Sequence, residues 1–317
     1  MTKKMMDKFD RHEPKIMDST AVMTFKTCPR KYLYRIIFGF VPPTKMPYFA
    51  FGSAYHKFRE VIELEWKEHG DFNRSVLAGL DAASDYCVKH LVTPSEGKWS
   101  FMTKDRLLGS CAVAAKWWKD EKIAGNIEVL ATEQPFRIII PSKVNPDGII
   151  IAGRADQIIK VRNYIYGRDF KTTSQAGGKD GGLSPFYINT VEPNDQFTRY
   201  TYAESILQFG ELRDNPRDRV NGQYIEVLVN SAKSPPEIEN LVTNRTKYQL
   251  EAWLEEHDVW MAIMKTCRDL DNWPMNEKSC NFCEYRRVCT KSSESAQMSE
   301  LKGSYEIEPW DCEKVAE

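Results

Sequence analysis

The sequence lacks the features that mark several common protein classes. None of its apolar runs approaches the length needed to cross a membrane. Residues 1–18 are charged and have no apolar core of the kind found in a secretory signal. We find no internal repeat, and a net charge of -1 does not by itself indicate a nucleic-acid partner. We therefore expect a cytoplasmic protein that has no membrane association.

Acidic residues are absent from one long stretch, residues 19–59. This stretch combines basic residues with ten aromatic residues, which are Phe25, Tyr32, Tyr34, Phe38, Phe40, Tyr48, Phe49, Phe51, Tyr55 and Phe58. Positive charge interleaved with aromatic rings is typical of surfaces that bind single-stranded nucleic acid. The same composition fits a helical segment whose rings form a core and whose charges face solvent. Composition alone leaves both interpretations open.

Four of the 8 cysteines have the spacing of a metal site. Cys28 lies near the N-terminus, whereas Cys280, Cys283 and Cys289 form a C-x2-C-x5-C cluster near the C-terminus. In a cytoplasmic protein, clustered cysteines indicate metal binding before they indicate disulfides. Three close thiols and a distant fourth could hold either an iron–sulfur cluster or a structural zinc ion. The other four cysteines lack ligand spacing, and we expect them to be small buried apolar residues.

The chain of 317 residues, with 42% hydrophobic content, suits a globular protein. Periodicity predicts helices over residues 24–39, 52–69, 73–91, 105–124, 193–209 and 243–270. Branched and aromatic residues predict strands over residues 129–140, 148–161, 164–172 and 224–229. Residues 177–184 are glycine-rich and should form a loop. A helix, three strands, a helix and a strand describe an α/β protein with a mixed sheet flanked by helices.

Two aspartates and a lysine should meet on one hairpin. If Arg162 and Asn163 are the two central residues of a tight turn, counting outward pairs Asp156 with Asp169. Paired residues project from the same face with Cβ atoms roughly 5 Å apart, and Lys171 shares that face. Other turn registers would break this arrangement.

Such a pair of carboxylates is costly to bury unless a positive charge lies between them. Lys171 supplies one charge, and a divalent cation would supply a larger one. Oxygen ligands with open water positions favour Mg²⁺ or Mn²⁺, which can activate water toward a phosphate. An ion-pair ladder on an exposed sheet face would use the same three residues.

Further polar residues recur at helical spacing. His56 follows Gly52 by four residues on the predicted helix 52–69, and Gln196 and Tyr200 lie four apart on the helix after the hairpin. A lone helical histidine is more often structural than a ligand.

Taken in order, these motifs resemble the PD-(D/E)XK nuclease superfamily in its RecB-like branch. The motifs are Gly52-x3-His56, Gly153-x-x-Asp156, Asp169-x-Lys171 and Gln196-x3-Tyr200. The cysteine layout is similar to that of the branch's iron–sulfur subset, which includes CRISPR-adaptation nucleases, the AddB subunit of helicase–nucleases and phage relatives. The resemblance runs from about residue 19 to residue 290. The chain shows no Walker A motif, so it is similar to the stand-alone members.

The resemblance implies specific roles. His56, Asp156, Asp169 and the backbone carbonyl of Phe170 would ligate Mg²⁺ or Mn²⁺, and Lys171 would be the catalytic lysine. Gln196 and Tyr200 would contact DNA, and we add Arg30 and Lys31 as DNA-binding candidates from the acid-free stretch. A 4Fe–4S cluster would be held by Cys28, Cys280, Cys283 and Cys289. The implied fold is a restriction-endonuclease-like core whose helical N- and C-terminal regions are joined by this cluster.

The expected activity is metal-dependent hydrolysis of DNA, with a single-strand-preferring exonuclease as the favoured type. The expected setting is a bacterial or phage-infected cell, in DNA processing, recombination or CRISPR adaptation. DNA is the expected partner, with another protein or a second copy as further candidates. A non-catalytic DNA-binding or partner-recognition module, or an unrelated zinc protein, are the alternatives. We expect a polar tail, a helical region, a nuclease core, an iron–sulfur region and an acidic tail (1–18, 19–128, 129–235, 236–298 and 299–317).

Overall fold

The structure is a computed structural model that describes residues 11, 16–43, 46–177 and 181–311. Contacts group the chain into two compact units, each built from separate stretches of sequence. We call residues 1–44, 135–154 and 248–317 the cysteine unit, and residues 45–134 and 155–247 the carboxylate unit. The expected helical region 19–128 is therefore divided between the two units. None of the described helices combines the length and apolar character needed to span a membrane.

The cysteine unit combines the beginning and the end of the chain. Its elements are β1 (Ile16–Met17), α2 (Ser19–Thr27), α3 (Pro29–Tyr32), the π-helical η1 (Leu33–Ile37), β2 (Phe40–Val41), α9 (Lys247–Asp269), η3 (Glu277–Phe282), α10 (Arg286–Cys289), α11 (Glu294–Ser304) and β8 (Glu306–Ile307). Strand β1 pairs with the first part of β4, and β2 pairs with β8. The expected acidic tail is thus ordered as far as it is described, because β8 pairs Ile307 with Phe40. Residues 312–317 lie outside the described residues.

Aromatic rings from the acid-free stretch form the core of the cysteine unit. Phe25 makes edge contacts with Tyr32 and Trp273, at centroid distances of 5.5 and 6.3 Å. Tyr34 packs on Tyr285 at 5.4 Å. In the whole stretch only Phe49 is strongly exposed and Tyr48 partly so, whereas the other eight rings are buried. The nucleic-acid interpretation of the stretch was therefore wrong for those eight rings, because they supply apolar area that the core requires.

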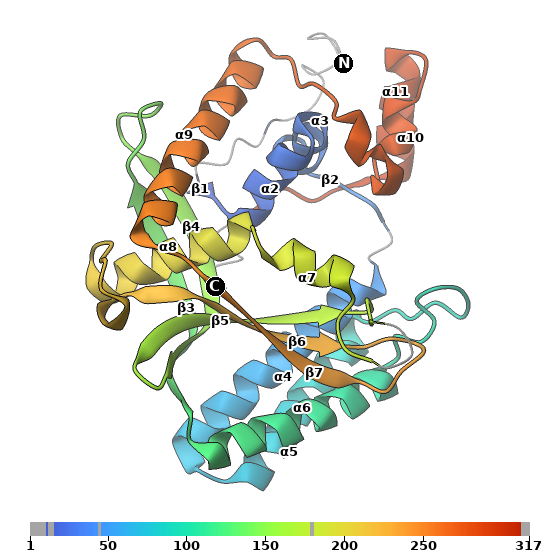
Figure 1. Ribbon diagram of the computed structural model, residues 1–317. Helices are drawn as coiled ribbons and strands as arrows, with labels where there is room; N and C mark the ends of the chain where they lie inside the picture. Colours follow the sequence, from blue (N-terminus) through green and yellow to red (C-terminus); the bar gives the residue numbers. More distant parts are fainter. Residues whose placement is uncertain (1–10, 12–15, 44–45, 178–180, 312–317) are drawn as a thin grey trace. The chain divides into compact units, whose positions relative to one another are not determined.

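The carboxylate unit contains a mixed sheet between two helical layers. Its elements are α4 (Pro47–His69), α5 (Phe72–His90), α6 (Lys104–Ala124), β5 (Tyr164–Thr173), α7 (Pro185–Val191), α8 (Asp195–Phe209), η2 (Pro216–Asp218), β6 (Val220–Val229) and β7 (Glu237–Asn244). Strands β3 (Ile127–Ile140) and β4 (Ile149–Val161) continue from one unit into the other. The strand order is β4-β5-β6-β7, with only β5 and β6 parallel. Figure 1 shows α4, α5 and α6 on one side of β5–β7 and α7 and α8 on the other.

Alternation along β5 and β6 assigns side chains to the two layers. Ile225, Val227 and Val229 pack with Val191 of α7 and Phe197 of α8. Phe170 and Leu228 belong to the larger core cluster, whose other members come from α4, α5, α6 and the segment before α6. Asp169 and Lys171 alternate with Phe170 and so project toward the layer of α7 and α8. The mixed α/β sheet flanked by helices confirms the predicted fold class.

Helix ends in this unit follow ordinary capping rules. Asn194 accepts hydrogen bonds from Gln196 N and Phe197 N at the start of α8. Helices α4, α6 and α8 all end at a glycine in the left-handed conformation, with φ of 65°, 65° and 72°. These signals explain why the predicted ends of the three helices were accurate, whereas α4 begins at Pro47, five residues before its predicted start.

Strand β7 was missed by the sequence prediction, which began a helix at Thr243. The structure continues the strand to Asn244 and starts α9 at Lys247. Strand β7 is the sheet edge, and its residues are mostly half-buried with polar side chains. An edge strand of this kind carries little apolar pattern, so periodicity could not reveal it.

Buried ions connect α4, α6, β5 and β6. The Glu226 carboxylate lies 3.0 Å from Arg59 and 2.5 Å from Arg168, and it also accepts a hydrogen bond from Tyr55 at 2.8 Å. Arg168 makes two further bonds to Glu121, at 2.8 and 2.7 Å. Two positive and two negative groups balance, as burial of charge requires.

Replacing Glu226 with alanine should leave Arg59 and Arg168 buried without their shared carboxylate. We expect the free energy of unfolding to fall by about 3–5 kcal/mol. The control is Glu211→Ala, which removes an exposed pair with Arg213 and should cost less than about 1 kcal/mol. Urea denaturation measures both values, and equal effects for the two variants would contradict the assigned importance of the network.

Candidate active site and cysteine pocket

The β4–β5 hairpin forms in the predicted register. Val161 pairs with Tyr164 across the two-residue turn, and the ladder runs to the pair Gln157 and Arg168. The next positions along the two strands are Asp156 and Asp169, which therefore lie opposite each other. Arg162 adopts φ of 56°, the left-handed conformation that such tight turns use.

The Asp169 carboxylate is held by Lys171. The lysine Nζ lies 2.8 Å from Oδ1 and 2.6 Å from Oδ2 of Asp169. Asp169 is almost fully buried, whereas the Lys171 side chain is 28% exposed. The ammonium also lies 5.8 Å from the centre of the Phe197 ring. The Asp169 carboxylate is thus buried within the protein, whereas the Lys171 side chain remains partly accessible to solvent.

The Asp156 carboxylate contacts His56 of α4 and the backbone of the neighbouring strand β5. Its Oδ2 lies 3.3 Å from His56 Nδ1 and accepts a 2.8 Å hydrogen bond from the Phe170 backbone N–H. Helix α4 approaches β5 closely because Gly52 has no side chain. A Cβ atom there would lie 3.3 Å from Thr172 Oγ1. This close approach accounts for the Gly52-x3-His56 spacing, since it lets His56 reach Asp156.

The His56–Asp156 pair shifts both groups toward their charged forms. Burial by itself lowers the pKa of His56, but the Asp156 carboxylate outweighs burial and the net pKa is raised. Burial by itself raises the pKa of Asp156, but His56, Lys171 and the Phe170 N–H together lower it. The charged form of each group is thus stabilised by the other, and the two pKa values move apart.

The two aspartates differ in their proton affinity. Burial raises the pKa of Asp169 and the Asp156 charge adds to this effect, so the net pKa is raised despite Lys171. Burial lowers the pKa of Lys171, but Asp169 and Asp156 reverse that shift, and the net pKa is raised. Lys171 therefore carries its positive charge at neutral pH.

Helix α8 brings the predicted Gln196 and Tyr200 to this face. The Tyr200 hydroxyl is hydrogen-bonded to Gln196, and burial together with the Asp169 charge raises the pKa of Tyr200 to about 12. Tyr187 on α7 was missed by the sequence prediction. Burial raises its pKa to about 12, and the group interacts electrostatically with Lys171 and Asp169. Its sole sequence signal was its place between the hairpin and α8, within a segment for which no helix was predicted.

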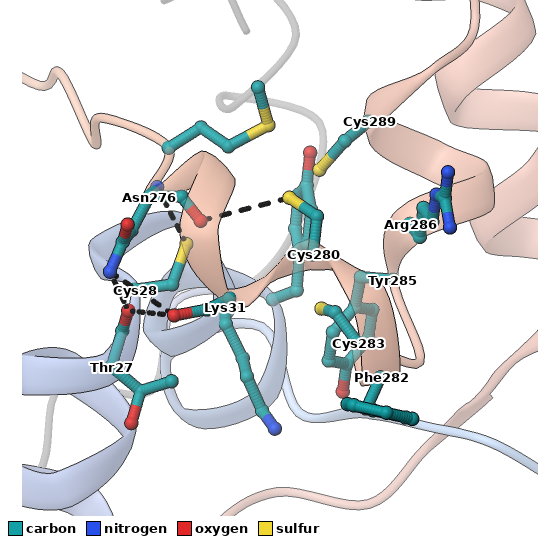
Figure 2. A pocket seen from close by; sticks show the side chains of 13 residues that line it. Thr27, Cys28, Lys31, Asn276, Cys280, Phe282, Cys283, Tyr285, Arg286 and Cys289 are labelled. Carbon is teal, nitrogen blue, oxygen red and sulfur yellow. Dashed lines mark hydrogen bonds between the residues drawn. The ribbon is translucent and has the colours of Figure 1, made fainter.

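The four predicted cysteines line one pocket of the cysteine unit. The pocket has a volume of about 210 Å³, and Cys28, Cys280, Cys283 and Cys289 surround it (Figure 2). All four are free thiols. The Asn276 backbone N–H lies 3.4 Å from Cys28 Sγ, and Cys280 Sγ lies 3.7 Å from the Asn276 carbonyl. Segments from near the beginning and near the end of the chain thus line the same pocket.

Arg30 and Lys31 lie beside the cysteines and already have partners. Arg30 Nε donates to the Trp273 carbonyl at 3.1 Å, and Lys31 pairs with Glu284 at 3.1 Å. Of the remaining cysteines, Cys87, Cys111 and Cys267 are buried, which confirms that they are small apolar residues. Cys312 lies outside the described residues.

Neither of the two candidate sites, as described, brings three possible ligand atoms within 4.8 Å of one another. Within the described ranges, only Glu65, Glu68 and His69 place three such atoms within 4.8 Å of one another. His69 lies 3.6 Å from each carboxylate in the last turn of α4, and Arg74 pairs with Glu65 at 3.2 Å. A histidine at a helix C-terminus with surface carboxylates is an ordinary solvent-exposed ion network.

The His56–Asp156 contact can be tested without measuring activity. In metal-free protein, Asp156→Asn should lower the pKa of His56 below its ordinary value of about 6.5, because burial and Lys171 both act in that direction. NMR titration of the imidazole protons measures this shift. The signals of His69 and His90 should be the same in the Asp156→Asn variant as in the unaltered protein. An unchanged His56 pKa would show that Asp156 does not control it.

Comparisons with known proteins show which solved structures the chain is similar to and which family it belongs to. The chain is similar to a Eubacterium rectale protein named "Putative exonuclease", at 13% identity and TM-score 0.49, over 88% of this chain and 91% of that one. A second solved structure, SSO0001, matches at 15% identity and TM-score 0.34, over 91% and 93%. None of the curated proteins matches. The pattern of the PD-(D/E)XK nuclease superfamily matches residues 19–290, so the chain belongs to that superfamily.

Proposed function

We propose that this protein is a metal-dependent DNA nuclease that hydrolyses phosphodiester bonds. The observation that carries the proposal is the convergence of Asp156, Asp169, Lys171 and His56 at one end of the β4–β5 hairpin. A member of a nuclease superfamily that has lost its activity would be expected to lack at least one of these groups. Here all four are present and in mutual contact or on one sheet face.

The donor set fits a hard divalent cation. Two carboxylates and an imidazole are ligands that Mg²⁺ or Mn²⁺ accepts, and the buried Asp169 carboxylate has Lys171 as its charged partner. We propose His56, Asp156, Asp169 and the Phe170 carbonyl as the ligands. When bound, the metal would lower the pKa of a water molecule and offset charge on the phosphate.

Lys171 is proposed as the catalytic lysine. Its ammonium is positively charged, partly exposed and fixed by Asp169, so it can hold a water molecule or a phosphate oxygen at a defined position. Water attacks phosphorus and loses a proton to solvent, the bond from phosphorus to the leaving sugar oxygen breaks, and that oxygen takes up a proton from solvent. Gln196 and Tyr200, hydrogen-bonded to each other on α8, are proposed to position the scissile phosphate.

We propose an exonuclease that prefers single strands, acting in bacterial or phage DNA processing, recombination or CRISPR adaptation. Arg30 and Lys31 lie in the cysteine unit, and their contacts hold that unit together. Within the carboxylate unit the proposed DNA contacts are those of Gln196 and Tyr200, and Arg30 and Lys31 are the candidates in the cysteine unit.

The cysteine pocket is proposed to hold a 4Fe–4S cluster rather than zinc. A tetrahedral zinc ion with Zn–S bonds of about 2.3 Å would hold its four sulfurs about 3.8 Å apart. No three of the described thiols lie within 4.8 Å of one another, although all four line the same pocket. Wider spacing suits thiolates that surround a cube of iron and sulfide. The proposed role of the cluster is structural, because it would tie the segment at Cys28 to the C-terminal cysteines.

Replacing Lys171 with alanine should reduce Mg²⁺- or Mn²⁺-dependent cleavage of end-labelled DNA by at least about 100-fold, because a fixed positive charge is lost from the reacting centre. Lys160→Ala is the matched control, since Lys160 is exposed and lies 4.0 Å from Glu128. Undiminished cleavage by the Lys171 variant would reject the proposal. DNA binding without any cleavage by the unaltered protein would instead favour a non-catalytic DNA-binding module.

Protein purified without air should be brown and should contain iron and sulfide in equal amounts. Cys283→Ser should remove most of the colour and lower thermal stability, because one cluster ligand is lost. Cys267→Ser, which alters a buried cysteine outside the pocket, should keep both iron and sulfide. One zinc per chain with neither iron nor sulfide would reject the cluster and leave the nuclease proposal standing.

A further inference from the structure

A patch of aromatic rings lies at the first turn of α4. Phe49 is 66% exposed, and its ring centre lies 4.4 Å from that of Tyr48. The Tyr48 ring lies 5.1 Å from Trp99, and the Lys98 ammonium lies 4.5 Å from the centre of the Trp99 ring. We call Tyr48, Phe49, Lys98 and Trp99 the aromatic patch. Tyr48 and Trp99 pack against the main core, so the exposed Phe49 ring rests on fixed neighbours.

Phe49 and His56 lie on the same face of α4. Seven residues of helix separate them, which is two turns and a rise of about 10 Å, and their directions differ by only about 20°. The positions between them on that face are Gly52 and Ser53, which carry at most a hydroxymethyl group. Thr172 of β5 lies against the Gly52 side of the helix, whereas Ser53 is exposed. On the Ser53 side, no bulky α4 side chain stands between the Phe49 ring and the imidazole that contacts Asp156.

The chemistry of the patch suits an unpaired base. The exposed Phe49 ring provides a stacking surface, and Lys98, which lies over the Trp99 ring of the same patch, provides an attraction for phosphate. Aromatic and basic side chains together typify binding of single-stranded nucleic acid. Bases within a duplex are already stacked on both faces and cannot use such a ring. A base released from pairing offers a free face, and its strand could continue over the exposed Ser53 toward His56.

We propose that Phe49 stacks on an unpaired nucleobase of the DNA strand whose phosphodiester bond is cut at the carboxylates. The inference rests on the proposed nuclease function and specifies its substrate as a strand with at least one unpaired base near the scissile bond. Phe49 acts as a specificity-determining residue, since it selects single-stranded over paired DNA without touching the reacting atoms.

Three variants at this position separate stacking from simple apolar contact. Phe49→Ala and Phe49→Leu remove the aromatic face, and each should weaken binding of single-stranded DNA and lower its kcat/KM by about tenfold. Phe49→Trp keeps an aromatic face and should stay within about twofold of the unaltered protein. Leu77→Ala on α5 is the control, because Leu77 is 63% exposed and belongs to neither site. Thermal melting shows whether each variant folds.

Substrates that lack single bases identify the stacked position. An oligonucleotide with one abasic residue, moved along the strand, should lower kcat/KM for the unaltered protein at one position only. At that position the abasic residue should cause no further loss in Phe49→Ala, because the same contact is already missing. Equal losses for Phe49→Ala on single strands and on blunt duplexes would overturn the proposal, as would binding within twofold of the unaltered protein.

Binding is also measured by fluorescence anisotropy with Lys171→Ala as the background, so that cleavage does not interfere. Weaker binding by Phe49→Ala in that background supports stacking even if the unaltered protein proves unable to cut DNA. Cleavage by the unaltered protein with no effect at Phe49 overturns the stacking site and leaves the nuclease proposal intact. The two proposals therefore fail separately.

Discussion

The carboxylate unit depends on one buried carboxylate. Glu226 lies between Arg59 of α4 and Arg168 of β5, and both guanidinium groups also lie over the Phe170 ring, at 4.6 and 5.5 Å. The network therefore fixes α4 against the strand that carries the candidate site. Because charges in a low-dielectric interior must be paired, the helix cannot shift along the strand without leaving an arginine uncompensated.

Because side chains alternate along β5, this anchored strand presents the candidate site residues on the face opposite to the arginines. Residues 168 and 170 point into the α4–α6 layer, while Asp169 and Lys171 point to the opposite layer. The Phe170 backbone links the two sides, since its N–H donates to Asp156 while its ring is held by the arginines. The candidate site residues are thus carried by a strand whose Phe170 side chain is buried in the core, and a rigid support of this kind is what a catalytic site needs.

The two candidate sites belong to different compact units. The cysteine pocket is built from segments 27–34 and 275–289, whereas the two aspartates belong to the β4–β5 hairpin and His56 belongs to α4. A cluster in the pocket would join chain segments that are about 250 residues apart in sequence, where loop closure is entropically expensive. We propose that its contribution is to the stability of the cysteine unit, and the chemistry of hydrolysis stays with Asp156, Asp169 and Lys171.

The sequence by itself determined the elements that have strong local signals: the hairpin register, the capped helices and the four-cysteine spacing. Counting outward from Arg162 and Asn163 sufficed because side chains alternate strictly along strands. The sequence could not reveal strand β7, the presence of Tyr187 at the candidate site, or which aromatic rings of the acid-free stretch become buried. Whether Phe25 and Tyr32 are buried while Phe49 is exposed depends on which elements pack against them, and identical residue types in one segment carry no such information. Tertiary packing alone decided that eight of those rings form cores and that Phe49 remains available at the surface.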